Sequence, residues 1–294
     1  MPDFDIKGTS NPVPTPSPSP APSITESQGQ TIGNPDPIGI TIADKKTPIL
    51  VFFGPPQCGK TMSLVRMARY LIAKGFTVNP NRNFRSANDE RYQSLCDSFN
   101  DIILSDKAQD STNLIDFLLV EVRYKGKCIC QILEAPGEGY FDPDDPDRKP
   151  PFRKYVDAVI TSPNRKLWII MVEPNWKSEK MRVRYVERIK HLRMKTKSSD
   201  DFLFLYNKID DTQLQLSDNE VNVDQAIEDV KNLYPGIFEP FRETRPILSL
   251  FGGYNRGFAP FTTGTYYKHD GGVVYQESSD TYPANLWRII RKKL

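Results

Sequence analysis

The chain has 294 residues with 39 basic and 37 acidic side chains, so its net charge is close to zero. This balance provides no overall field that would draw the protein to nucleic acid or to a membrane surface. The four cysteines lack the spacing of a disulfide framework, which indicates a reducing compartment. No apolar run approaches about 18 residues and no signal sequence opens the chain. We therefore expect a cytoplasmic protein without a transmembrane segment.

Residues 1–45 differ in composition from the rest of the chain. Proline alternates with serine and threonine between Pro12 and Pro22, and large apolar side chains are scarce. Such a segment cannot bury enough surface to offset the entropy lost on ordering, so we expect it to be disordered. It would serve as a spacer, or it would dock on an aromatic groove of a protein partner.

Residues 46–294 alternate between strand and helix patterns, which predicts one α/β domain. We expect a three-layer fold around a mostly parallel six-stranded sheet with one antiparallel edge strand, formed by a hairpin. The predicted strands are residues 48–53, 117–124, 127–133, 167–172, 202–206 and 247–251. The predicted helices follow residue 59 and cover about 88–99, 178–197, 223–234 and 283–293, and an aromatic hairpin is expected at 258–276.

A phosphate-binding pattern, G-x-x-x-x-G-K-[ST], lies between the first strand and the first helix. Its glycines allow the backbone to wrap around phosphate oxygens, and the start of the following helix favours an anion. The lysine can reach the β- and γ-phosphates, and the threonine hydroxyl can bind Mg²⁺. The expected nucleotide-binding residues here are Gly54, Pro55, Pro56, Gln57, Cys58, Gly59, Lys60 and Thr61.

Two further motifs follow predicted strands. Glu134-Ala-Pro-Gly137-Glu138 comes after the third strand, and Asn207-Lys208-Ile209-Asp210 comes after the fifth. Ligands of open α/β sheets bind outside the carboxyl ends of the strands. We therefore expect both motifs to lie on the same edge of the sheet as the phosphate loop.

With these motifs, residues 46–294 resemble a P-loop GTPase domain of the Ras-like, translation-factor-related (TRAFAC) class. The resemblance implies that Asp210 accepts hydrogen bonds from guanine, that Lys208 packs along the base and that Asn207 braces the loop. Adenine lacks those donors and would leave a desolvated carboxylate unpaired. Ser249 falls near the family's base-contacting serine, although Leu250 and the residues after it depart from that motif.

The second switch motif departs from the family pattern. Glu134 stands where the family has the aspartate that holds Mg²⁺ through water, and its extra methylene must alter the metal geometry. Gly137 fits the glycine that senses the γ-phosphate. Glu138 takes the place of the water-orienting glutamine, where a carboxylate would repel that phosphate. For the metal-binding threonine of the first switch we expect Thr112, with Thr77 as the alternative.

These features favour a slow GTPase that binds GTP or GDP with Mg²⁺ and acts as a switch, with Lys60, Gly137 and Glu138 in catalysis. A nucleotide-binding scaffold with little hydrolysis is the first alternative, and an ATP-using P-loop protein is the second. Arg82 and Arg85 are candidates for an internal arginine finger. A protein partner, an effector or activator, is expected to supply the output.

Overall fold

The computed structural model describes residues 39–104, 117–141, 152–176, 178–217, 220–242, 256–269 and 272–294. Residues 1–38, which make up most of the predicted disordered segment, lie outside these ranges. Thr112, Ser249 and the strand predicted at 247–251 also lie outside them.

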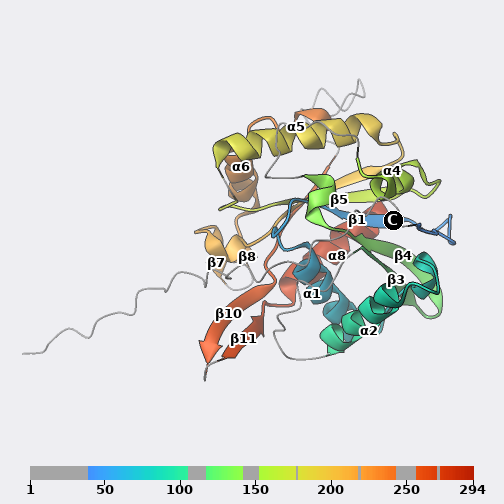
Figure 1. Cartoon of the computed structure of the whole chain (residues 1–294). Helices are drawn as coiled ribbons and strands as arrows, with labels where there is room; N and C mark the ends of the chain where they lie inside the picture. Colours follow the sequence, from blue (N-terminus) through green and yellow to red (C-terminus); the bar gives the residue numbers. More distant parts are fainter. Residues whose placement is uncertain are drawn as a thin grey trace, which may run out of the picture. The chain divides into compact units, whose positions relative to one another are not determined.

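A seven-stranded sheet forms the centre of the domain (Figure 1), in the order β2-β3-β4-β1-β5-β6-β9. All neighbouring strands are parallel except the two pairings that involve β3. The α/β class and the mostly parallel sheet are thus as predicted. The strands are β1 (Ile49–Phe53), β2 (Thr77–Pro80), β3 (Leu118–Tyr124), β4 (Lys127–Glu134), β5 (Lys166–Val172), β6 (Asp201–Tyr206) and β9 (Gly257–Pro260).

Two details of the predicted sheet are corrected. The sequence analysis missed β2, a four-residue strand in which Val78 alone is fully buried, so its apolar pattern is too short to detect. Because β2 pairs with β3, the antiparallel strand is one position in from the edge rather than at it. The turn between β3 and β4 is the expected tight hairpin, with Lys125 and Gly126 both at positive φ.

Helices cover both faces of the sheet (Figure 1). Helices α1 (Lys60–Ala73), α2 (Glu90–Leu104) and α8 (Thr281–Lys293) lie on one face, and α4 (Lys154–Thr161), α5 (Glu179–Lys195) and α6 (Val223–Leu233) lie on the other. This three-layer arrangement leaves β1 and β5 buried along their whole length. None of the described helices is long and apolar enough to cross a membrane.

Shorter elements complete the described chain. A single helical turn, α3 (Gly137–Tyr140), follows β4, and 3₁₀ turns cover Arg82–Phe84, Ile209–Asp211 and Glu239–Phe241. The aromatic stretch expected to form one hairpin is divided between β9 and the ribbon of β10 (Gly264–His269) and β11 (Gly272–Glu277). A second small ribbon pairs β7 (Gln215–Ser217) with β8 (Glu220–Val221).

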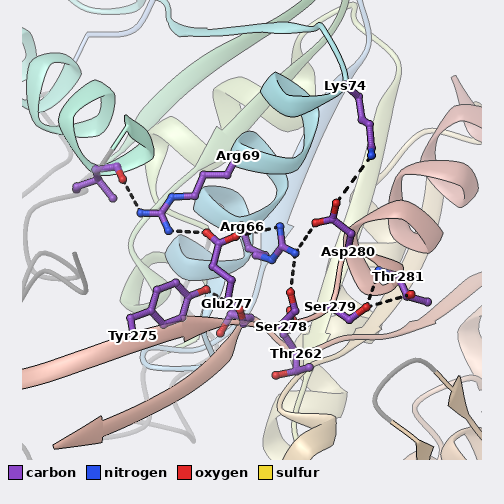
Figure 2. A network of polar contacts seen from close by, with 12 residues as sticks. Arg66, Arg69, Lys74, Thr262, Tyr275, Glu277, Ser278, Ser279, Asp280 and Thr281 are labelled. Atoms are coloured by element: carbon purple, nitrogen blue, oxygen red, sulfur yellow. Dashed lines mark hydrogen bonds and ion pairs between the residues drawn. The ribbon is translucent and has the colours of Figure 1, made fainter. Parts of the chain in front are cut away.

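Charged side chains tie the β10–β11 ribbon to helix α1 (Figure 2). The Arg66 side chain is 2% exposed and forms ion pairs with Glu277 at 3.4 Å and Asp280 at 2.8 Å. Its guanidinium also donates to the Ser278 carbonyl at 2.7 Å. Arg69 pairs with the same Glu277 carboxylate at 2.5 Å. Since both arginines belong to the helix that starts at the phosphate loop, this network fixes the entry to α8 against that helix.

Residues 39–45, which were expected to belong to the disordered segment, contact the folded domain in this structure. Ile40 and Ile42 pack against the core, and the Thr41 amide donates to the Phe84 carbonyl at 2.8 Å. The Asp44 carboxylate accepts from Thr47, which lowers the pKa of that carboxyl below its usual value. Two isoleucines and one backbone hydrogen bond hold residues 39–45 against the domain. A composition averaged over residues 1–45 does not reveal so short a stretch.

Candidate functional site

The phosphate loop joins β1 to α1 and has no room for side chains at two of its glycines. A Cβ atom on Gly54 would lie 2.6 Å from the Cys58 Sγ and 2.8 Å from the Met171 Cβ. At Gly59, which adopts a φ of +87°, a Cβ would lie 2.3 Å from the Asn207 Nδ2. Close packing therefore requires glycine at both positions, and at Gly59 the positive φ requires it as well.

The amino end of helix α1 is available to an anion. Its capping residue, Gly59, offers no side chain, and no acidic residue lies in the first turn. Gln57 at a φ of 62° and Gly59 at 87° turn the backbone in the left-handed region, the conformation that gathers successive N–H groups into an anion-binding concavity. Pro55 and Pro56 carry no N–H, so the amide donors of the loop are those of Gly54 and of residues 57–61.

Lys60 folds back along the phosphate loop. Its ammonium donates to the Pro55 carbonyl at 2.8 Å and the Gly54 carbonyl at 3.2 Å, and the residue is only 6% exposed. A buried ammonium held by neutral carbonyls lacks a full counter-charge, so an anion at this position would gain strongly. Cys58 is buried beside it, and desolvation raises the pKa of its thiol to about 11. That thiol is therefore protonated at neutral pH.

Thr61 and Glu134 meet although they are far apart in sequence. The Thr61 hydroxyl donates to the Glu134 Oε1 at 3.1 Å, and Glu134 is 2% exposed at the end of β4. Neighbouring oxygens around Mg²⁺, at bonds of about 2.1 Å, are separated by roughly 3.0 Å. The two side chains thus offer hard oxygen ligands at a suitable separation, and the longer carboxylate reaches the hydroxyl.

Gly137 packs directly on the phosphate loop. A Cβ atom there would lie 2.2 Å from the Pro56 nitrogen and 2.4 Å from the Pro55 carbonyl carbon. The turn is anchored by Tyr140, whose buried ring lies 4.7 Å from that of Phe53. Arg188 donates to the Tyr140 carbonyl at 2.7 Å. The backbone of Glu138 belongs to this turn, whereas its side chain lies outside the described part of the structure.

The loop after β6 is tied to the phosphate loop. The Asn207 Nδ2 donates to the Cys58 carbonyl at 3.0 Å, and the residue is 2% exposed. Lys208 adopts a φ of 57°, and its ammonium lies 3.5 Å from the Gln57 carbonyl. Among the described residues, none supplies a hydrogen-bond partner to the buried Oδ1 of Asp210. This loop therefore places an acceptor beside the phosphate loop.

One residue of this edge was missed by the sequence analysis. Glu173 directly follows β5, is 4% exposed and forms an ion pair with Lys208. Burial raises the pKa of the Glu173 carboxyl, while the Lys208 and Lys60 ammonium groups oppose that shift. A single glutamate after a strand belongs to no recognisable pattern, so only its place at the strand end could have indicated it.

Three predicted residues do not join the site. Thr77 begins β2 opposite Arg123, at the edge of the sheet where β1 starts, so it is not a candidate for the first switch. Arg82 pairs with Asp97. Arg85 pairs with Asp89 at 2.5 Å and lies over the Tyr92 ring. Both arginines are thus engaged with α2 in this structure.

No protein-family model and no curated protein matches this chain. Solved structures with a similar arrangement include Roco2 RocCORdC of Methanosarcina barkeri bound to GDP, at 13% identity and a TM-score of 0.34, covering 87% of this chain and 50% of that one. The Saccharomyces cerevisiae Ski7 GTPase-like domain, bound to GDP and inorganic phosphate, is 11% identical with a TM-score of 0.41, and the match covers 84% of this chain and 50% of that one. A putative nucleolar GTP-binding protein 1 of Plasmodium falciparum is 15% identical with a TM-score of 0.34, and the match covers 76% of this chain and 80% of that one.

The chain spans about half the length of the Roco2 and Ski7 structures. Because each of these TM-scores is below 0.5 and each identity is below 25%, the likeness carries no argument about activity.

Proposed function

We propose that this protein binds a guanine nucleotide at the carboxyl edge of its sheet and hydrolyses GTP slowly as a molecular switch. The observation that carries the proposal is the junction of two loops by the bond between Asn207 Nδ2 and the Cys58 carbonyl. This bond holds the loop with the buried Asp210 acceptor beside the open amino end of α1. The base of a nucleotide could therefore bind to Asp210 while its phosphates bind at the amino end of α1.

Asp210 would select the base. A carboxylate with a buried, unsatisfied oxygen gains most from a ligand edge that carries adjacent N–H donors, as guanine does at N1 and N2. An adenine would leave the same oxygen desolvated and unpaired. Lys208, held beside Gln57 of the phosphate loop, would cover the base with its methylene stem.

Lys60 and the amides of residues 57–61 would hold the phosphates. The Lys60 ammonium would exchange two carbonyl acceptors for phosphate oxygens, which are stronger acceptors because they are charged. Thr61 and Glu134 would hold Mg²⁺, which supplies charge compensation to the phosphate oxygens when bound. The Gly137 amide would contact the last phosphate, which requires its turn to move relative to Pro56.

A nucleotide-binding scaffold with little hydrolysis is the second candidate function. It is favoured by the phosphate loop itself, because Pro55 and Pro56 supply no N–H to the charge that spreads over the transferred phosphate. The same two prolines contact Gly137, so rearrangement of that turn is opposed by packing. An adenine-specific site would leave Asp210 unexplained.

Single-turnover GTP hydrolysis by the whole chain separates the two functions, with Lys60→Ala as the blank. A switch should hydrolyse GTP above the blank at a slow rate, below roughly one per minute, because Arg82 and Arg85, the candidates for an internal arginine finger, are paired with Asp97 and Asp89 instead. Glu138→Gln should leave that rate unchanged or raise it, since charge repulsion is removed while an acceptor is kept. A tenfold fall would identify Glu138 as a working base, and a rate equal to the blank would favour the scaffold.

A further inference from the structure

Glu173 stands out among the buried charges of the domain. Its carboxylate follows a strand whose seven residues are all buried, and its neighbours are the phosphate loop and the loop after β6. It belongs to none of the sequence motifs that carry the proposed function. A buried carboxylate loses its hydration, and pairing with a cation compensates for that loss only in part. If this position had a purely structural role, an apolar side chain would fill it without the cost of desolvating a charge.

The backbone of Glu173 is held on both sides by a single hydroxyl. Its amide donates to the Tyr234 Oη at 3.3 Å, and the Tyr234 hydroxyl donates to its carbonyl at 2.8 Å. Tyr234 is 1% exposed at the end of α6. The carboxylate therefore projects from a backbone position that is held in place at the end of β5.

The cation, in contrast, is long and more exposed. The Lys208 side chain is 41% exposed, and its residue adopts a left-handed conformation that a lysine adopts only at some cost in energy. A lysine side chain that is free in solution loses conformational entropy when it is fixed. The ion pair with Glu173 restricts this side chain before any ligand arrives, and the Gln57 carbonyl at 3.5 Å lies on its other side.

We propose that Glu173 is a positioning residue for nucleotide binding, which acts by holding Lys208 between the phosphate loop and the loop that reads the base. The inference rests on the proposed function, because it assigns a role at the same site. Preorganisation of Lys208 lowers the entropy lost when a nucleotide binds, so the pair strengthens binding without touching the ligand through Glu173.

A double-variant cycle on GDP affinity tests this role, using the full chain and calorimetric titration. Glu173→Gln keeps the shape and removes the charge, and Lys208→Met keeps the stem and removes the cation. Each should weaken GDP binding about tenfold. The double variant should be no weaker than either, because both changes remove the same arrangement.

Asp201→Asn is the matched control. Asp201 begins β6, the strand whose other end leads into Lys208, and it forms ion pairs with Arg165 and Lys293. Loss of those pairs should leave the GDP affinity unchanged even where it lowers the melting temperature. Any general effect of breaking an ion pair on this strand would appear in this variant.

Two results would overturn the inference while wild-type protein still binds GDP. One is a Glu173→Gln variant with wild-type affinity, and the other is a double variant about a hundredfold weaker, the product of two independent effects. If Glu173→Gln fails to fold, Glu173→Asp replaces it in the same cycle, because the shorter carboxylate keeps the charge but withdraws from Lys208: equal affinities of Lys208→Met and the double variant support the role, and a tenfold difference contradicts it. Wild-type protein that binds no GDP would instead refute the proposed function, and this role with it.

Discussion

The two edges of the central sheet use buried polar side chains in different ways. At the edge where β1, β5 and β6 begin, such side chains fix neighbouring backbone: the Asp200 carboxylate accepts from the Lys166 amide at 3.0 Å and the Lys197 amide at 3.2 Å. Gln131 and Asn164 both donate to the carbonyls of Asp44 and Thr47. These contacts join strand starts to the segments that lead into them.

At the edge where the same strands end, polar side chains join loops to one another instead. Thr61 contacts Glu134, Asn207 contacts Cys58, and Glu173 contacts Lys208. Each contact joins two segments that are far apart in the sequence at the edge where the phosphate loop lies. The comparison implies that changes at this edge alter binding more than stability, whereas changes at the opposite edge do the reverse.

The largest effect should come from Lys60→Ala. Removal of a buried ammonium that faces the phosphates should weaken both GTP and GDP by about 3 kcal/mol or more, which is over a hundredfold. Because its present partners are backbone carbonyls rather than a carboxylate, the melting temperature should change little. Unchanged nucleotide affinity, measured by calorimetry, would remove Lys60 from the site.

Asp210→Asn should change the choice of base with a somewhat smaller effect. The amide presents an NH₂ donor where the carboxylate presented an acceptor, so guanine loses a partner and xanthine, which has a carbonyl at that position, gains one. We expect GDP to weaken by about 2 kcal/mol and xanthosine diphosphate to be preferred. A competition titration with both nucleotides measures this exchange, and a parallel loss of both would argue against base reading by Asp210.

Asp200→Ala should show the opposite behaviour, because Asp200 lies at the other edge. The change leaves two backbone amides and the indole N–H of Trp168 without their acceptor, which should cost about 1–3 kcal/mol of stability. At about 2–4 °C per kcal/mol, the melting temperature should fall by several degrees. GDP affinity should stay at its wild-type value, and a variant that lost affinity but kept its melting temperature would break the comparison.

Two amino-terminal deletions should give the smallest effects and locate the start of the folded domain. Removal of residues 1–38 should leave the melting temperature unchanged, since their composition cannot support a core. Removal of residues 1–45 should lower it by a few degrees, because Ile40, Ile42 and the Asp44 carbonyl are lost. Equal melting temperatures for the two deletions would show that residues 39–45 contribute nothing to stability.

Much of the fold and part of the site could be predicted from the sequence, for local reasons. The phosphate loop is specified within eight residues. The buried strand β1 and residues 167–172 of its neighbour β5 are continuous apolar runs in the sequence. Because ligand-binding groups gather at the carboxyl ends of strands, Glu134 could be expected near Thr61, although 73 positions separate them in the sequence. The assignment of Asp210 to guanine remains a prediction.

What the sequence could not indicate depends on contacts between distant segments. Strand β2 has little apolar character of its own and forms because β3 offers it an edge. The role proposed for Glu173 depends on its ion pair with Lys208, which folds back onto it. The packing of Gly137 on Pro55 and Pro56 likewise requires the position of β4 relative to β1. Such relations are set by the tertiary structure and leave no periodic signal.

Calorimetric titration of the whole chain with GDP, GTP and ATP, with and without Mg²⁺, tests the central claim most directly. We expect GDP and GTP both to bind, because they share the base that Asp210 contacts. ATP should bind at least a hundredfold more weakly, because it leaves Asp210 unpaired. Mg²⁺ should strengthen binding through Thr61 and Glu134. Equal affinities for ATP and GTP would contradict the reading of guanine at this site, and absence of binding by all three would contradict the nucleotide site altogether.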